Sequence, residues 1–267
     1  MKSVLIATDL SSIARNATEY AMEAVKVATG SVILFHLFKV SSHTANSLIG
    51  TAGIDAMFES RKKEMEAYAA SLSREHGIPV TAEVRMGDFP DEIKTVYQEN
   101  NCRMLVLGMP QKTFEQDLLG NTTTAAIYTL EFPILAIPET AKYKGLKKIL
   151  FACDLAKEIQ DSVIEKIKEF ALLYGSEVEI LYVSNTIDSA SEKENIRQTL
   201  VDIVYHYKRE PPSESIIQTI LSEAEAISAD MIIMTPNKYG FWSSLLHRSK
   251  TRAMASNGRL PLLSLPY

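Results

Sequence analysis

VLIATDL at residues 4–10 and its near-copy ILFACDL at residues 149–155 decide the fold of this chain. Each is a short apolar run closed by Asp-Leu, and the second follows the first by 145 positions. FPILAIP at 132–138 returns as LPLLSLP at 260–266, at the shorter offset of 128 positions. The two offsets indicate that one domain is encoded twice, and that the second copy has lost about 17 residues in its middle.

The domain boundary is predicted in a polar stretch that precedes the second apolar run. This stretch runs from Glu139 to Lys147 and contains Gly145. A chain of 267 residues is long enough for two domains of about 100–150 residues, each with a core of its own. We therefore expect one domain at 1–140 and a second, degenerate one at 146–267.

Each copy alternates short apolar runs with helical patterns, which is typical of βαβ units around a parallel sheet. In the first copy we expect strands at 3–8, 31–37, 79–85, 103–108 and 133–137, and helices at 12–28, 54–76, 90–100 and 121–130. In the second we expect strands at 148–152, 177–183, 202–207, 231–235 and 262–265, and helices at 157–173, 190–199, 213–228 and 248–257. The predicted fold class is α/β, with two tandem doubly wound domains, each a five-stranded parallel sheet with helices on both faces.

The first helix is the best-marked element of the chain. Ser11 or Ser12 can cap its N-terminus, and an alanine-rich stripe at helical spacing follows. Gly30 is expected to end it, because glycine adopts the left-handed conformation that closes many helices.

Composition and charge exclude several classes of protein. Asp plus Glu number 33 against 28 Lys plus Arg, a net charge of −5 that argues against a nucleic-acid backbone as the main partner. No apolar run reaches the roughly 18–20 residues of a membrane span, and the N-terminal run is too short for a signal peptide. The two cysteines, Cys102 and Cys153, form no CxxC motif, which fits a reducing, cytoplasmic location.

The chemistry is expected at the carboxyl ends of the parallel strands, where open α/β sheets bind their ligands. Asp9 follows the first strand and Gly108 ends the fourth. Gly120, Asn121 and Thr122 then precede an alanine-rich helix, where N–H groups, hydroxyls and the positive helix end can together cradle a phosphate. The same residues also suit an ordinary helix N-cap, and both interpretations stay open at this point.

The chain resembles the universal stress proteins over nearly its whole length. The resemblance is carried by VLIATDLSSIARNATEYA at 4–21, by MLVLGMPQKTFEQDLLGNTTTAAIYTLEFPILAIP at 104–138, and by their counterparts in the second copy. It implies a fold like that of the adenine nucleotide α-hydrolase group and a role in the stress response. The order of these motifs, given twice, carries the resemblance, since no single motif is decisive.

Universal stress protein domains commonly pair through their last strands. The resemblance therefore implies that Ile134 to Ile137 meets Leu262 to Leu265 antiparallel. Such a pairing would make one chain an intramolecular pseudo-dimer and give each exposed sheet edge a partner. A homodimer of two such chains is compatible with the family precedent.

The nucleotide-binding branch of that family carries Gly, two residues, Gly, nine residues, Gly and then Ser or Thr after its fourth strand. Gly108 and Gly120 match the outer glycines, whereas Gln111 replaces the middle one and the second spacer is one residue short. Asn121 stands in for the hydroxyl residue, with Thr122 next to it. By this resemblance these residues would hold the phosphates of ATP together with Mg²⁺.

The resemblance extends to the nucleoside side of the same site. Asp9 matches the acidic residue that lies near the adenosine moiety, and the backbone around Leu37 and Phe38 would lie near the adenine. A side chain at Gln111 can obstruct close approach to the phosphates, because glycine is the residue that lets a ligand come near the backbone. The first copy is thus an altered site, and both binding and loss of nucleotide stay open.

The second copy departs further from the family pattern. Thr235 and Lys238 replace the first two glycines, and His247 and Arg248 replace the final Gly-polar pair, so family-style ATP binding is not expected there. Lys238 and Arg248 could instead hold an anion through side-chain charge. The alternative is that these basic residues lie in solvent at the start of a helix and bind no ligand.

Two functions follow from the sequence. The first is a cytoplasmic stress protein that senses or stores adenine nucleotide in its first domain, and the alternative is a non-enzymatic interaction module that binds none. No base, arginine finger or metal-ligating cluster is recognisable, so an active hydrolase or kinase has little support and any turnover would be slow and incidental. The histidines show no ligand spacing and predict no metal site; they are His36, His43, His76, His206 and His247. Cys153, beside Asp154, is either a reactive thiol or a buried small residue.

Overall fold

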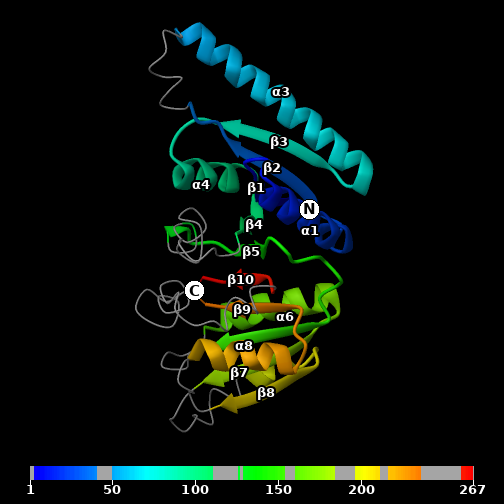
Figure 1. Ribbon diagram of the computed structural model, residues 1–267. Helices are drawn as coiled ribbons and strands as arrows, with labels where there is room; N and C mark the ends of the chain where they lie inside the picture. The colour runs from blue at the N-terminus through cyan, green and yellow to red at the C-terminus, as the bar shows by residue number, and fades with distance from the viewer. Residues whose placement is uncertain are drawn as a thin grey trace. The chain divides into compact units, whose positions relative to one another are not determined.

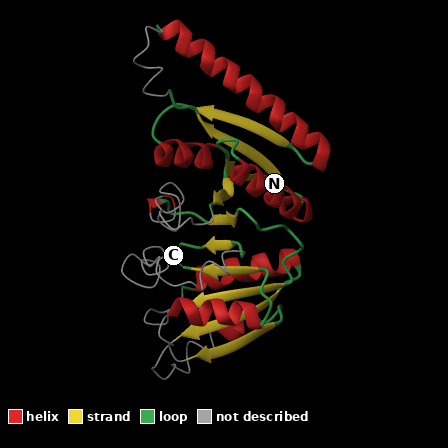
Figure 2. Cartoon of the chain, viewed as in Figure 1, coloured by secondary structure: helices red, strands yellow, loops and turns green. Residues whose placement is uncertain are grey.

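The computed structural model describes residues 3–40, 50–110, 126, 129–153, 160–183, 196–210, 216–235 and 260–266. These residues belong to two compact units, Met1–Gly108 and Met109–Tyr267. Both units combine helices with a mostly parallel sheet, so each is an α/β structure as predicted (Figure 2). No described helix combines the length and the apolar composition that crossing a bilayer requires.

The first unit is built on four parallel strands. These are β1 (Ser3–Ala7), β2 (Ser31–Leu37), β3 (Val80–Arg85) and β4 (Cys102–Met109), and its described helices are α1 (Ser12–Ala28), α3 (Thr51–His76) and α4 (Phe89–Glu99). The strand order is β3-β2-β1-β4, and β1 pairs in parallel with both β2 and β4 (Figure 1). The chain winds from β1 out to β3 and then returns to β4 on the other side of β1, so the switch point where such sheets place their ligands lies between β1 and β4.

Helices cover both faces of this sheet. α1 contacts β1 and β2, α3 contacts β2 and β3, and the two helices contact each other, so they share one face. α4 connects β3 to β4 in the opposite direction, and a right-handed crossover places it on the other face. There Phe89 of α4 packs edge-to-face on Phe35 of β2, with ring centroids 6.0 Å apart.

Both ends of α1 show how local chemistry sets its bounds. Ser11 is the N-cap and accepts a hydrogen bond from Ala14 N–H, as predicted. The helix ends at Ala28 as predicted, but Thr29 rather than Gly30 takes the left-handed conformation, at φ 49°. The N–H groups of Thr29 and Gly30 then bond back to the carbonyls of Lys26 and Val25, and this pattern closes the helix.

Thr29→Gly is expected to raise the free energy of unfolding by about 0.5–1 kcal/mol. A β-branched residue is strained at positive φ, whereas glycine is not, although glycine also gains entropy in the unfolded chain. Urea denaturation followed by circular dichroism measures the difference. Ala28→Gly, one residue earlier and inside the helix, is the matched control and is expected to be destabilising.

The second unit repeats the same strand order. Its strands are β5 (Ile134–Pro138), β6 (Lys148–Cys153), β7 (Glu177–Val183), β8 (Tyr205–Glu210), β9 (Met231–Met234) and β10 (Leu262–Ser264), and its described helices include α6 (Asp161–Tyr174) and α8 (Ile216–Ala226). The order is β5-β10-β9-β6-β7-β8, so β8-β7-β6-β9 matches β3-β2-β1-β4 of the first unit. β6 to β10 are parallel to one another.

The last strands of the two sequence copies pair within this unit. β10 lies antiparallel to β5, with Leu262 opposite Ala136 and Ser264 opposite Ile134, as the resemblance led us to expect. This pairing explains why β5 groups with the second unit although its sequence closes the first copy. The pseudo-dimer itself, and the copy boundaries at 140 and 146, stay predictions.

The prediction of a strand at 202–207 was wrong at its start. Residues 201–203 form a turn, closed by a hydrogen bond from Ile203 N–H to the Leu200 carbonyl, and β8 begins only at Tyr205. Val201 and Val204 are 72% and 56% exposed, so their apolar character reflects no buried face. β8 lies at the sheet edge and pairs with β7 alone, which leaves fewer neighbours to specify its start. The predicted helices at 121–130 and 248–257 lie largely or wholly outside the described residues.

Candidate functional site

The predicted residues within the described part of the chain meet at one edge of the first sheet. β1, β2 and β4 are parallel, so their carboxyl ends coincide. Continuing the strand register by one residue on β2 and by two on β4 places Thr8 beside His36 and Gly108, with Asp9 one residue further on. The other predicted residues lie outside the described part; they are Gly120, Asn121, Thr122, Lys238 and Arg248.

The loop from β1 to α1 is held by its own side chains. The Thr8 hydroxyl accepts from Leu10 N–H at 3.0 Å, and Asp9 Oδ1 accepts from Ser11 N–H at 2.9 Å. Leu10 between them adopts φ 66°, which is uncommon for a residue other than glycine. Arg15 Nε donates to the Leu10 carbonyl at 3.0 Å. These bonds fix Asp9 at the strand end before any ligand arrives.

Asp9 is an exposed carboxylate that is stabilised in its charged form. Partial burial raises its pKa, but hydrogen bonds from the Ser11 hydroxyl and N–H, together with the charge of His36, lower it by more. The net pKa is below the ordinary value of 3.8. Asp9 therefore carries a negative charge at neutral pH and can accept hydrogen bonds from hydroxyl groups of a ligand.

Titration of Asp9 is expected to show a midpoint below 3.8, measured by carboxyl-carbon NMR. Because the folded-state pKa is depressed, its contribution to stability is present above the ordinary pKa and is lost as pH falls through the folded-state value. Ser11→Ala is expected to raise the midpoint, and to cost about 1 kcal/mol as the helix loses its cap. Ser12→Ala, at the next position, is the control and should change neither the Asp9 midpoint nor the stability. An equal shift of the midpoint in Ser12→Ala would contradict the role assigned to Ser11.

His36 is a site residue that the sequence analysis missed. It lies on β2, is 9% exposed, and its Nδ1 is 2.8 Å from the Thr8 carbonyl. Because a carbonyl only accepts, Nδ1 must be the donor of this hydrogen bond. The signal that could have found it is positional, since His36 stands at the end of the second strand as Thr8 stands at the end of the first.

Packing by itself requires a glycine at position 108. A Cβ at this position would lie 2.8 Å from Ile13 Cγ2 and 3.0 Å from the Ile13 carbonyl oxygen. The first turn of α1 can approach the end of β4 because no side chain stands between them. The glycine that the resemblance assigns to phosphate binding therefore also sets the position of the helix beside Asp9.

Leu37 and Phe38 form the β2 side of the edge. Phe38 N–H donates to the Arg85 carbonyl at 2.8 Å, and its buried ring packs edge-to-face on Phe58 of α3, with centroids 5.6 Å apart. Leu37 is partly exposed. The backbone here is thus held firmly at the same edge as Asp9.

The cysteines are buried residues rather than reactive thiols. Cys153 is 8% exposed and its Sγ lies 3.5 Å from the Leu181 carbonyl. Burial raises the pKa of Cys102 to about 11, so the thiol is protonated at neutral pH. Of the two interpretations of Cys153, the structure supports the buried small residue.

A comparison with models of known protein families matches the part of the chain that contains both the first sheet and this edge. A model of the universal stress protein family matches residues 1–138, which include β1 to β5 and the whole described part of the site. The chain belongs to the universal stress protein family. A comparison with curated proteins found no match.

Solved structures extend the likeness to the second half of this universal stress protein. The crystal structure of a universal stress protein from Archaeoglobus fulgidus is similar with a TM-score of 0.75 and 20% identity, over 99% of this chain and 98% of that one. A functionally unknown protein from Pseudomonas aeruginosa has a TM-score of 0.59 and 16% identity, over 100% and 92% of the two chains. Residues 139–267 lie within both likenesses, so the second half of the chain shares the fold of these solved structures.

Proposed function

We propose that this universal stress protein binds an adenine nucleotide in its first copy, as a cytoplasmic sensor or store. The observation that carries the proposal is the convergence of Asp9, His36 and Gly108 at the carboxyl edge of β1, β2 and β4. An exposed carboxylate with a depressed pKa stands there on a loop that is already ordered. Ordering the loop in advance lowers the entropic cost of binding.

In this proposal each residue has a separate part. Asp9 accepts hydrogen bonds from the ribose hydroxyls, and the backbone at Leu37 and Phe38 contacts the adenine. Gly108 lets α1 and the end of β4 approach closely. The phosphates and Mg²⁺ are held by three residues that follow later in the chain, Gly120, Asn121 and Thr122. In the second copy, Lys238 and Arg248 remain a candidate anion site. Pairing of the copies through β5 and β10 as a pseudo-dimer belongs to the same proposal.

Two measurements on the full chain test this proposal. Freshly purified protein is denatured and its supernatant analysed for nucleotide by mass spectrometry, and Mg²⁺-ATP is then titrated by calorimetry. We expect about one nucleotide per chain, because the second copy lacks the matching glycines. Gly120→Asp is expected to abolish binding through charge repulsion with the phosphates.

Asp9→Asn and Asp154→Asn form a matched pair for the same titration. Asparagine keeps an oxygen that can accept from Ser11 N–H, so Asp9→Asn removes the charge while preserving the loop. We expect it to weaken ATP binding by about 10-fold or more, the loss of a charge-assisted hydrogen bond. Asp154→Asn, the counterpart in the second copy, should leave binding unchanged. Two nucleotides per chain, or equal effects of the two variants, would contradict the assignment to the first copy.

The alternative is an interaction module that binds no nucleotide. The packing of Gly108 on Ile13 favours it, because this contact accounts for the glycine without a ligand. The Asp9–Ser11 hydrogen bond likewise gives Asp9 a structural role. No nucleotide recovered, and no heat at millimolar ATP, would establish this alternative over the binding site.

A further inference from the structure

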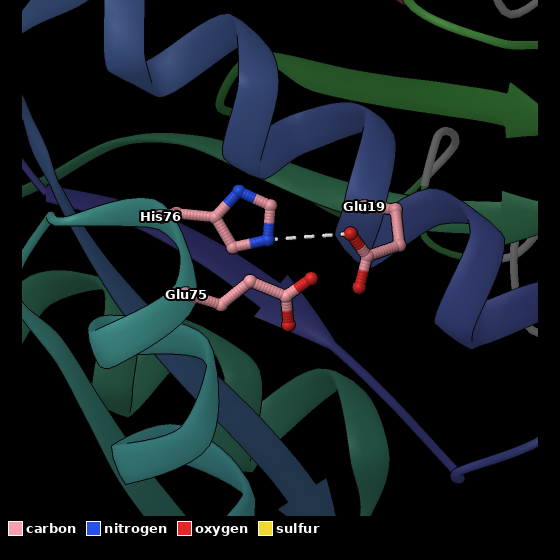
Figure 3. A group of neighbouring side chains, drawn as sticks. All are labelled: Glu19, Glu75 and His76. Atoms are coloured by element: carbon pink, nitrogen blue, oxygen red, sulfur yellow. Dashed lines mark ion pairs between the residues drawn. The ribbon is translucent and has the colours of Figure 1, made fainter.

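A cluster of carboxylates surrounds one buried histidine where α1 meets α3. Glu19 and Glu23 lie one turn apart on α1, and Glu75 and His76 lie in the last turn of α3. One ligand-type atom from each of Glu19, Glu75 and His76 lies within 4.8 Å of the others. In Figure 3 both carboxylates point toward the same side of the imidazole ring.

The two nitrogens of His76 have different surroundings. The side chain is 6% exposed, and Nδ1 lies 3.1 Å from Glu23 Oε1 in a hydrogen bond. A carboxylate accepts, so Nδ1 donates and the lone pair of the neutral ring is on Nε2. Nε2 is buried and makes no hydrogen bond within the described part of the chain, although Glu19 Oε2 is 3.3 Å away.

This geometry fits two ligands of one ion better than a hydrogen bond. A tetrahedral ion with ligands at about 2.0–2.1 Å holds its donor atoms about 3.3–3.4 Å apart, since both point at the ion and not at each other. The Nε2–Oε2 pair has that separation and lacks hydrogen-bond alignment. Glu75 supplies the third ligand-type atom, within 4.8 Å of the other two, and both glutamates are exposed.

The contacts of Glu23 and Lys26 next to His76 match a pattern that is common at metal sites. A histidine that binds a metal through one nitrogen usually donates its other N–H to a carboxylate, which fixes the tautomer. Glu23 occupies that position, and Lys26 Nζ, 3.1 Å from the same oxygen, balances its charge. The carboxylates of Glu19 and Glu75 then remain to balance a divalent cation.

We propose that Nε2 of His76 and the carboxylates of Glu19 and Glu75 bind a divalent transition-metal ion of the Zn²⁺ type, with Glu23 as the positioning residue. One imidazole and two carboxylates form a mixed nitrogen and oxygen set that suits Zn²⁺ better than Mg²⁺. The ion would join the C-terminal end of α3 to the middle of α1. This site is separate from the nucleotide edge and does not rest on the proposed function.

Zn²⁺ titration of the full chain by calorimetry tests the proposal, with Mg²⁺ as the ion that should not compete. We expect one Zn²⁺ site to disappear in Glu75→Gln and in His76→Gln, and Zn²⁺ to raise the melting temperature of the unmodified chain but not of these variants. Glu23→Gln should weaken the site by about 10–100-fold, as loss of an outer carboxylate does in other metal sites. Glu66→Gln, an exposed carboxylate on the same helix, is the control and should bind like the unmodified chain.

Glu75 is exposed, so Glu75→Gln keeps the test valid even if His76→Gln fails to fold. Equal Zn²⁺ stoichiometry and affinity in Glu75→Gln, Glu66→Gln and the unmodified chain would overturn the proposal. Absence of Zn²⁺ binding by the unmodified chain would overturn it as well, and the cluster would then be an ion-pair contact between α1 and α3.

Discussion

Phe35→Ala is expected to lower the free energy of unfolding by about 3–5 kcal/mol, the usual cost of removing a buried aromatic ring. Phe35 is 0% exposed in the middle of the first unit, between β1 and β3. Its ring also packs edge-to-face on Phe89, a geometry that adds about 0.5–1.5 kcal/mol beyond burial. The variant thus loses contacts on β2 and the packing of α4 on the sheet.

Urea denaturation by circular dichroism measures this effect, and hydrogen exchange locates it. The chain has two units, so a single transition cannot be assumed, and exchange at the β1 and β2 amides should report the first unit specifically. Phe35→Leu is the matched control, because leucine keeps most of the apolar volume. A loss for Phe35→Ala no larger than for Phe35→Leu would contradict the packing described here.

Gly108→Ala is expected to cost about 1–3 kcal/mol, as overpacking of a close contact does. The added Cβ would lie 2.8 Å from Ile13 Cγ2 and 3.1 Å from the Ile13 carbonyl carbon, and the backbone atom cannot rotate away. The first turn of α1 must shift, and the loop that carries Asp9 shifts with it. We therefore expect nucleotide affinity, where present, to fall together with stability.

Two variants separate the parts of this effect. Ile13→Ala combined with Gly108→Ala removes the side-chain overlap but not the backbone overlap, so it should restore only part of the stability. Gly50→Ala introduces a Cβ with no atom within 4 Å and at an ordinary φ of −66°, and it should cost less than about 1 kcal/mol. Full restoration by the double variant would show that the backbone contact is not the constraint.

Much of the fold could be predicted from the sequence because its signals are local. The bounds of α1 and β2 agree with the prediction residue for residue, since an apolar stripe, a serine cap and a short apolar run each act within a few positions. The repeat of VLIATDL as ILFACDL predicted two copies of one domain, and the two units share one strand order. The prediction failed at Thr29, which takes the left-handed conformation expected of Gly30, and at the start of β8, which lies at the sheet edge.

The candidate site was predictable only in part. Asp9 and Gly108 were found because the carboxyl ends of parallel strands meet at one edge. His36 was not, because a lone histidine carries no motif and its contact with Thr8 depends on strand register. The contact of Gly108 with Ile13 was missed for a similar reason, since the resemblance assigned the glycine to phosphate.

The sequence by itself determined the α/β class, the two copies, the core strands and the presence of an acidic residue after β1. It did so because the burial pattern and the end of a strand depend on residues that are consecutive in the chain. Only the tertiary structure decided which distant side chains meet. His76 and Glu19 are separated by 57 positions, so no spacing rule for metal ligands could join them. They meet because α1 and α3 pack on the same face of the sheet, and that contact depends on the strand order and the right-handed crossovers.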